Sequence, residues 1–279
     1  MKIHLISHTN EPLKSIAIPM INMGIGRAVR SADEVTESEA EGYFNEVIKS
    51  HLPEPLTFAS FNLFWEDVPI FILRQLIRSH IGWSFAERSL RFFDPNIKTP
   101  VDEYDFENGM PVINKTETEQ GKPPFFGTPL KEVTKMEMKR QLDLYAELIK
   151  AGSDQQDARN ILGVWFPTDI QTTCTYMALR HLLSKRLSSQ AHPMWQDASK
   201  QIKELITKVS PQLGEALVDA CAIEGRCVWN SRLDRDCADC IARGLKKAHE
   251  HNWTRTTSFG ENTQCDCGIL KPMNLIENK

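Results

Sequence analysis

A short stretch of this chain joins a strongly apolar run to an unusual density of cationic and polar side chains. Residues 70–73 read Ile-Phe-Ile-Leu, and residues 74–91 contain four arginines, one histidine, one glutamate and three serines. The apolar positions recur at helical spacing, which predicts a helix with one apolar side. These positions are Phe71, Leu73, Leu76, Ile77 and Ile81.

The arginines of this predicted helix share a second side. Arg74 and Arg78 lie four positions apart, so their side chains project in the same direction. Like charges that project together from a half-buried helix repel each other and destabilise the folded chain unless an anion lies between them. Phosphate and pyrophosphate suit arginine because its planar guanidinium donates two parallel hydrogen bonds. An anion-binding site and a solvated basic face with local salt bridges both remain open from the residues alone.

The charge of the whole chain restricts which ligand this cluster could bind. There are 37 acidic and 33 basic side chains, a formal net charge of −4. Sequence-independent binding of DNA or RNA depends on a basic surface, so we expect no nucleic-acid partner. No apolar run approaches the ~20 residues that a membrane helix requires, so we expect no membrane partner either. A local basic cluster in an acidic chain favours a small anionic ligand.

The chain contains seven cysteines, an odd number. This usage indicates a reducing compartment rather than a disulfide scaffold, and the N-terminus lacks the apolar stretch of a signal peptide. We therefore expect a cytoplasmic protein. Towards the C-terminus, Cys237 and Cys240 form a Cys-x-x-Cys pair, and Cys265 and Cys267 form a Cys-x-Cys pair. The first spacing suits tetrahedral zinc and the second is less common, so zinc and free thiols both remain open.

The remaining pattern mixes strands with long helices. The predicted strands cover residues 2–7, 56–64 and 163–173, and residues 16–21 fit either a short helix or a second strand. The predicted helices cover residues 33–50, 131–151, 157–162, 176–186 and 195–224, the last divided near Ser210-Pro211. Ser153 with Gln156 three residues later resembles a capping box. Residues 96–128 show weak periodicity, which predicts a long irregular connection.

Several segments resemble the flavin-dependent thymidylate synthases. Residues 1–9 are similar to the first strand of that family, and His51 with residues 58–61 is similar to its His-x-x-Phe segment. The central part of the resemblance is Arg74-Gln75-x-x-Arg78 followed by Ser84, Glu87, Ser89 and Arg91. Farther on, Ala158-Arg159, Ile161-Leu162, His181, Arg186 and Ala191 keep the spacing of the family. The resemblance covers roughly residues 1–200.

The resemblance implies a fold and an assembly. The expected fold is α+β, with a mixed or antiparallel sheet and long helices. Residues 1–220 would form the catalytic domain, and residues 221–279 a cysteine-rich C-terminal extension. The expected assembly is a homotetramer whose active sites are built from several chains.

The resemblance also assigns roles to particular residues. The implied nucleotide-binding residues are Gln75, Glu87, Ser89, Arg91, Arg159 and Arg186. Ser89 and Arg91 would lie nearest the phosphate. Arg186 would act catalytically at the pyrimidine ring, where its charge stabilises the electron density that develops during the reaction. The implied flavin contacts are Arg78, His80, His181 and, less strongly, His51.

The implied reaction moves a one-carbon unit from methylenetetrahydrofolate to C5 of dUMP, giving dTMP, with FAD as cofactor and NADPH as its reductant. The family signature Arg-His-Arg is here Arg78-Ser79-His80, and its asparagine is Ala86. The nucleotide positions are thus better kept than the flavin positions. Two alternatives follow from this loss of pattern. One is a pyrimidine nucleotide hydroxymethylase on the same scaffold, and the other is a non-catalytic nucleotide-binding relative that has lost flavin.

Overall fold

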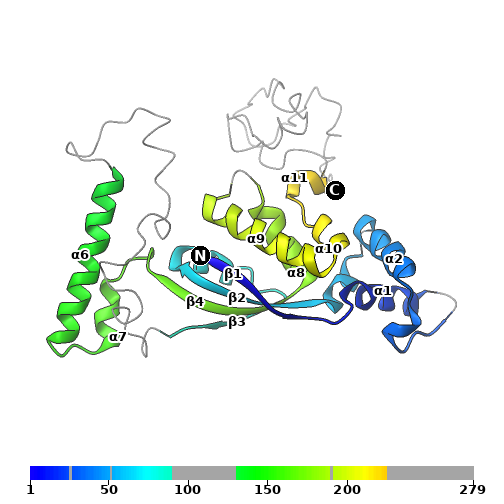
Figure 1. The fold of residues 1–279 in the computed structure, drawn as a ribbon, viewed down its shortest axis with the longest axis horizontal. Coiled ribbons are helices and arrows are strands. Elements are labelled where there is room, and N and C mark those ends of the chain that lie inside the picture. Colours follow the sequence, from blue (N-terminus) through cyan, green and yellow to red (C-terminus); the bar gives the residue numbers. More distant parts are fainter. Residues whose placement is uncertain (25–26, 51, 90–129, 189–190, 225–279) are drawn as a thin grey trace, which may run out of the picture.

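A four-stranded antiparallel sheet forms the centre of the computed structural model, which describes residues 1–24, 27–50, 52–89, 130–188 and 191–224 (Figure 1). The strand order is β1-β2-β4-β3, and each neighbouring pair is antiparallel. The strands are β1 (Lys2–His8), β2 (Ser60–Pro69), β3 (Trp83–Glu87) and β4 (Pro167–Thr175). With the helices around it, this sheet confirms the predicted α+β class.

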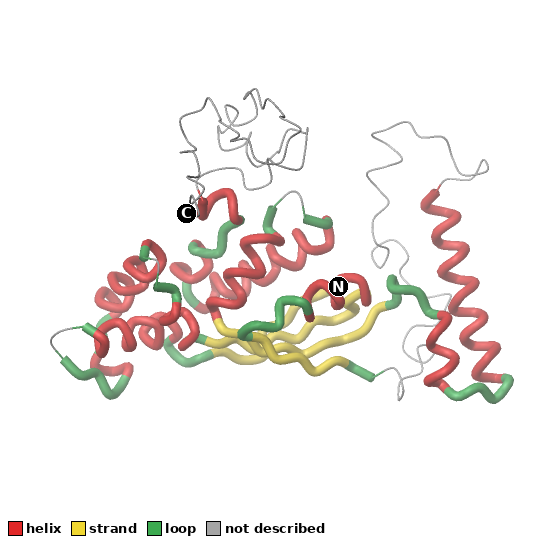
Figure 2. The backbone as a smooth tube through the Cα atoms, turned by 180° about the vertical axis from the view of Figure 1, so that it is seen from behind, coloured by secondary structure: helices red, strands yellow, loops and turns green. Residues whose placement is uncertain are grey.

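One face of the sheet carries the hydrophobic core. Along β2, Phe61, Leu63 and Trp65 are fully buried, and the residues between them are partly exposed. This alternation arises because successive side chains of a strand point to opposite faces. The helices α8 (Tyr176–Arg186), α9 (Pro193–Val209) and α10 (Pro211–Glu215) cover the buried face, and among the described residues no helix covers the other face (Figure 2).

Further helices extend beyond both ends of the sheet (Figure 1). At one end lie α1 (Pro12–Met23) and α2 (Glu37–Lys49), and at the other lie α6 (Leu130–Lys150) and α7 (Gln155–Ala158). Met138 and Leu142 of α6 pack on Trp165 and Phe166, which gives this end a small core of its own. The remaining short elements are η1 (Ala32–Glu34), η2 (Glu54–Phe58), α3 (Ile70–Ile77), η3 (Arg159–Ile161) and α11 (Ala220–Glu224).

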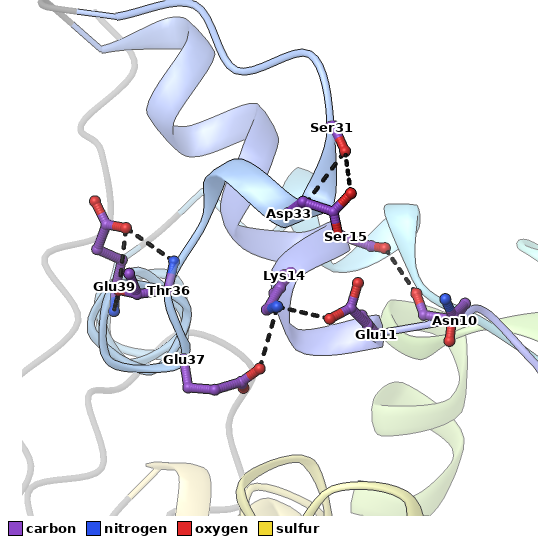
Figure 3. Close-up of polar contacts among 9 residues, drawn as sticks. All are labelled: Asn10, Glu11, Lys14, Ser15, Ser31, Asp33, Thr36, Glu37 and Glu39. Atoms are coloured by element: carbon purple, nitrogen blue, oxygen red, sulfur yellow. Dashed lines mark hydrogen bonds and ion pairs between the residues drawn. The ribbon is translucent and has the colours of Figure 1, made fainter.

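Polar contacts fix α1 and α2 relative to each other (Figure 3). Lys14 Nζ lies 2.6 Å from Glu11 Oε1 and 3.2 Å from Glu37 Oε1. The hydrogen bond that Lys14 donates to the Glu11 carboxylate is the main reason that the pKa of Lys14 is raised. The backbone N–H of Glu39 donates to Thr36 Oγ1 at 3.2 Å, and that of Thr36 donates to Glu39 Oε2 at 3.0 Å. This reciprocal capping box defines where α2 begins.

Most predicted elements are confirmed, and several boundaries differ. The helix over 176–186 and the division near Ser210-Pro211 occur where they were predicted. Residues 16–21 belong to a helix, α1. The predicted strand over 56–64 is wrong in its first part, because Leu56 N donates to Pro53 O at 3.0 Å and this bond closes a 3-10 turn. The strand β2 then runs five residues past the predicted end at Phe64.

The helix predicted over residues 70–81 is shorter than its apolar pattern suggested. It ends at Ile77, and the next four residues form a turn that leads to Gly82, whose φ is +73°. Ile72 is fully buried, whereas the side chain of Ile81 is 75% exposed. The helical period therefore continues in the sequence past the point where the backbone leaves the helix.

The capping box predicted at Ser153 is also wrong. Asp154 caps α7 instead, because its Oδ1 accepts a hydrogen bond of 2.7 Å from Gln156 N. A carboxylate at this position also interacts favourably with the positive end of the helix dipole.

Candidate functional site

Two of the predicted nucleotide-binding residues meet at one buried aromatic side chain. Trp195, on α9, is fully buried, and its Nε1 donates a hydrogen bond of 3.0 Å to Gln75 Oε1 on α3. The guanidinium carbon of Arg186 lies 4.8 Å from the centroid of the same indole ring. Arg186 is the last residue of α8, so three separate helices converge here. We name Gln75, Arg186 and Trp195 the Trp195 cluster.

Arg186 carries its charge against a ring face. Its Nε is buried without a hydrogen-bond partner among the described residues, and desolvation lowers the pKa of the guanidinium. The ordinary pKa of arginine is so high that the group stays cationic at neutral pH. An aromatic face attracts a cation without neutralising it. Arg186 therefore offers a full positive charge to a ligand.

The indole also fixes which end of the Gln75 amide faces outward. The Nε1 of tryptophan can only donate a hydrogen bond, so Gln75 must present its oxygen to it. Within the described residues, no hydrogen bond joins Gln75 Nε2 to another side chain or carbonyl. This nitrogen can therefore donate to a ligand.

The predicted flavin residues Arg78 and His80 lie in the turn that follows α3, and both are exposed. This turn is held against the start of α8, because Thr175 N donates to Gly82 O at 3.0 Å. A Cβ at position 82 would lie 2.9 Å from both Ala178 Cβ and Thr175 Oγ1, closer than side chains approach. The backbone of the turn is thus fixed, although the side chains of Arg78 and His80 project into solvent.

The predicted phosphate-binding segment begins at the end of β3. Glu87 is the last residue of this strand, and partial desolvation raises the pKa of its carboxyl group. Ser89 lies two residues on and is exposed. Between them, Arg88 Nη2 lies 2.6 Å from the buried Asp169 Oδ2, and Asp169 Oδ1 accepts a bond of 3.0 Å from Asp67 N. Arg88 therefore anchors this segment to β4.

The other predicted residues are dispersed. Arg159 lies in η3 beside α6 and α7, and its side chain is half-buried. His181 is exposed on α8, and its Nε2 lies 2.9 Å from Lys185 Nζ. Desolvation, followed by the charge of Lys185, lowers the pKa of His181. His51 and Arg91 lie outside the described residues.

The cysteines of the zinc hypothesis lie outside the described residues, which include two other cysteines, Cys174 and Cys221, both buried. Desolvation raises the pKa of the Cys174 thiol far above its usual range. In the described ranges no group of three potential metal ligands occurs, and no helix is long and apolar enough to cross a membrane. Zinc binding by the C-terminal cysteines stays a prediction.

The pattern of the sequence did not single out two residues that organise the site. Trp195 is separated from Gln75 by 120 positions, and Asp169 from Arg88 by 81 positions. A lone tryptophan on an amphipathic helix indicates a core position, and nothing local identifies its distant partner.

Comparison with known proteins agrees with this fold. A family model described as "Thymidylate synthase complementing protein" matches residues 4–212. The chain belongs to this family. A flavin-dependent thymidylate synthase of Saccharolobus solfataricus is 26% identical over 234 residues, which are 82% of each chain. One of Pyrococcus furiosus is 23% identical over 77% of this chain and 80% of its own.

A solved structure also resembles the chain. The crystal structure of a UMP/dUMP methylase, PolB, from Streptomyces cacaoi bound with 5-Br dUMP superimposes with a TM-score of 0.60. The match covers 77% of this chain and 93% of that chain at 20% identity, so it supports the fold alone. Together with the family match, it confirms the predicted family and fold, and the curated relatives confirm an enzyme of this type.

Proposed function

We propose that this protein transfers a one-carbon unit from methylenetetrahydrofolate to C5 of dUMP in a flavin-dependent reaction that yields dTMP. The names of the curated relatives support flavin-dependent thymidylate synthesis. The observation that carries the proposal is the Trp195 cluster. It brings Gln75 and Arg186, two groups expected to bind the nucleotide, onto the N–H edge and the ring face of one indole.

In this proposal Arg186 acts at the pyrimidine ring. Its cation, held in a partly desolvated position, stabilises negative charge that develops on the ring during attack by C5. Gln75 Nε2 donates to a nucleotide oxygen and fixes the orientation of the ligand. Glu87, Ser89, Arg91 and Arg159 complete the nucleotide site, with Ser89 and Arg91 at the phosphate.

The residues assigned to the cofactor fit FAD in their chemistry. Arg78 and His80 are exposed, and in the described part of the chain neither forms an ion pair with a carboxylate. Arginine suits a pyrophosphate, and imidazole can donate to the carbonyl oxygens of a flavin. His181 and His51 are further candidates for the same contacts. When bound, the flavin would supply hydride and NADPH would reduce it.

The dispersion of the predicted residues supports a site completed by other copies of the chain. Arg159 lies with α6 and α7, beyond one end of the sheet, whereas Arg186 lies over its buried face (Figure 1). Half-buried arginines at both places would then serve one ligand in an assembly. We therefore expect a homotetramer, which light scattering of the purified protein would measure.

One assay tests the proposed reaction. The protein is incubated with dUMP, methylenetetrahydrofolate, FAD and NADPH, and the nucleotide product is identified by mass, with Arg186→Ala as the inactive control. A methylated product is the expected result. A hydroxymethylated product would identify the hydroxymethylase instead, and a colourless protein that takes up no FAD and forms no product would identify a non-catalytic relative.

A further inference from the structure

Trp195 has no role among the residues predicted from the sequence, yet it contacts two of them. We propose that Trp195 is a positioning residue that orients Gln75 and Arg186 together and thereby sets the affinity for the nucleotide. The inference rests on the proposed function, because it takes Gln75 and Arg186 as nucleotide-binding groups. It concerns how they are held.

The indole of Trp195 is itself held firmly. Its ring lies edge-on to that of Trp65, with centroids 6.1 Å apart and an interplanar angle of 77°. Trp65 is in turn fixed by a hydrogen bond of 2.9 Å from its Nε1 to Thr172 Oγ1. At the start of α9, Trp195 N donates to His192 O at 2.8 Å, which fixes the backbone. The direction of the indole N–H and of the ring face is therefore set by the core.

The fixed N–H of Trp195 determines which way the side-chain amide of Gln75 is turned. An amide side chain can rotate by half a turn with little change in shape, exchanging its oxygen for its nitrogen. The N–H of Trp195 favours one orientation, because the opposite one would bring two donors together. A ligand then meets an amide donor, which suits a phosphate or a pyrimidine carbonyl oxygen.

A fixed ring face restricts Arg186. A free arginine side chain has several rotatable bonds, and ordering it on binding costs conformational entropy. Stacking at 4.8 Å orders it in advance. A carboxylate would order it equally well, but would compete with an anionic ligand for the same charge. The aromatic ring orients the cation and leaves its charge available.

Two substitutions separate these contributions. Trp195→Phe keeps a ring face for Arg186 and removes the N–H that orients Gln75, so nucleotide should bind about threefold to tenfold more weakly. Trp195→Leu removes both contacts, and the loss should reach about fiftyfold. Both are measured as dissociation constants by calorimetry on the full chain, with dUMP, UMP, dCMP and orthophosphate as separate probes.

Tyr176→Phe is the matched control. It removes a buried hydrogen bond of 2.7 Å, from Tyr176 Oη to Leu213 O, from the same core, at a residue that is as buried as Trp195 and whose ring neighbours are Phe44 and Phe61. Its melting temperature should fall about as far as that of Trp195→Phe, and its nucleotide affinity should stay within about twofold of wild type. Equal losses of affinity in the two variants would overturn the inference, since the effect would then be general softening of the core.

A double-mutant cycle gives the deciding result. If Trp195 acts through Gln75, then Trp195→Phe should cause no further loss of affinity in a Gln75→Ala background. The same fold-loss in both backgrounds would contradict this mechanism. Wild-type protein that binds none of the four probes would overturn it too. If nucleotide binds but no methylated product forms, the proposed reaction fails while the positioning role is still measured.

Discussion

Two groups of predicted site residues begin on the same short helix and differ in how their side chains are held. Gln75, within α3, is bound to a buried indole, and that indole also carries Arg186. Arg78, at the end of the same helix, and His80 in the following turn are exposed. The Trp195 cluster is thus ordered by contacts within the chain, whereas the turn offers a fixed backbone with solvated side chains.

This difference has a consequence for binding. Groups that are ordered in advance lose little conformational entropy when a ligand arrives, and exposed side chains lose more. The nucleotide part of the site should therefore tolerate few substitutions. The residues predicted to bind flavin should be sensitive mainly through the loss of individual side chains, because substitutions there leave the core unchanged.

The largest effect is expected from Arg186→Ala, which removes the cation of the ordered group. A hydrogen-bonded charge contributes about 1.5–3 kcal/mol, so dUMP affinity should fall by roughly tenfold to hundredfold, with product formation lost. Calorimetry with dUMP measures the effect. Arg180→Ala on the same helix is the control, because Arg180 Nε instead donates to Ala216 O at 3.4 Å. Equal losses of dUMP affinity in both variants would show that Arg186 has no special role in nucleotide binding.

A large effect on stability is expected from Arg88→Ala. This change leaves the carboxylate of Asp169, only 4% exposed, without its guanidinium partner 2.6 Å away. The free energy of unfolding should fall by about 1–3 kcal/mol, since Arg88 itself is partly exposed. Urea titration checks this value. The conservative Arg88→Lys should recover part of the loss, and full stability in Arg88→Ala would show that the ion pair contributes nothing.

A smaller effect is expected in the exposed turn. Arg78→Ala and His80→Ala should each weaken FAD binding by about tenfold, while the free energy of unfolding changes by less than about 0.5 kcal/mol. Fluorescence titration with FAD measures the affinity. Arg30→Ala removes an exposed cation elsewhere and should change neither property. Unfolding of the turn variants would mean that these side chains support the fold, contrary to their exposure.

The smallest effect concerns pH. Burial lowers the pKa of His192, whose Nδ1 accepts a bond of 3.3 Å from Met194 N at the start of α9. The unfolded chain therefore binds a proton more readily, and stability should fall as the pH drops below about 6.5, the ordinary value for histidine. His192→Asn keeps a capping acceptor and should flatten this slope in thermal melts between about pH 7.5 and pH 5.5. An unchanged slope would exclude His192 as its source.

The sequence predicted local elements better than their ends. The pattern over 176–186 predicted α8 correctly, because the apolar residues at helical spacing begin directly after Thr175, which caps the helix. The pattern over 70–81 was misleading at its C-terminal end, where Ile77 and Ile81 continue the helical period without being buried. Periodicity reports which residues are apolar, and the turn that leads to Gly82 decided where the helix ends.

For the site, the family resemblance predicted Gln75 and Arg186 as nucleotide-binding residues, and the structure places both against Trp195. It could not identify Trp195 or Asp169, because each acts through a partner at least 81 positions away. Pairings of this kind depend on how the sheet and α9 pack. The roles of all the predicted site residues stay predictions, including those of His51 and Arg91, which lie outside the described residues. The others are Gln75, Arg78, His80, Glu87, Ser89, Arg159, His181 and Arg186.

Gly82 limits which substitutions the turn after α3 can tolerate. Residues 78–80 have departed from the family signature, and exposed side chains can change in this way without disturbing any packing. Two positions later a single methyl group would collide with the beginning of α8. Substitution of Gly82 would therefore move the whole turn over residues 78–81, so the backbone path there should tolerate mutation far less than the exposed side chains of Arg78 and His80.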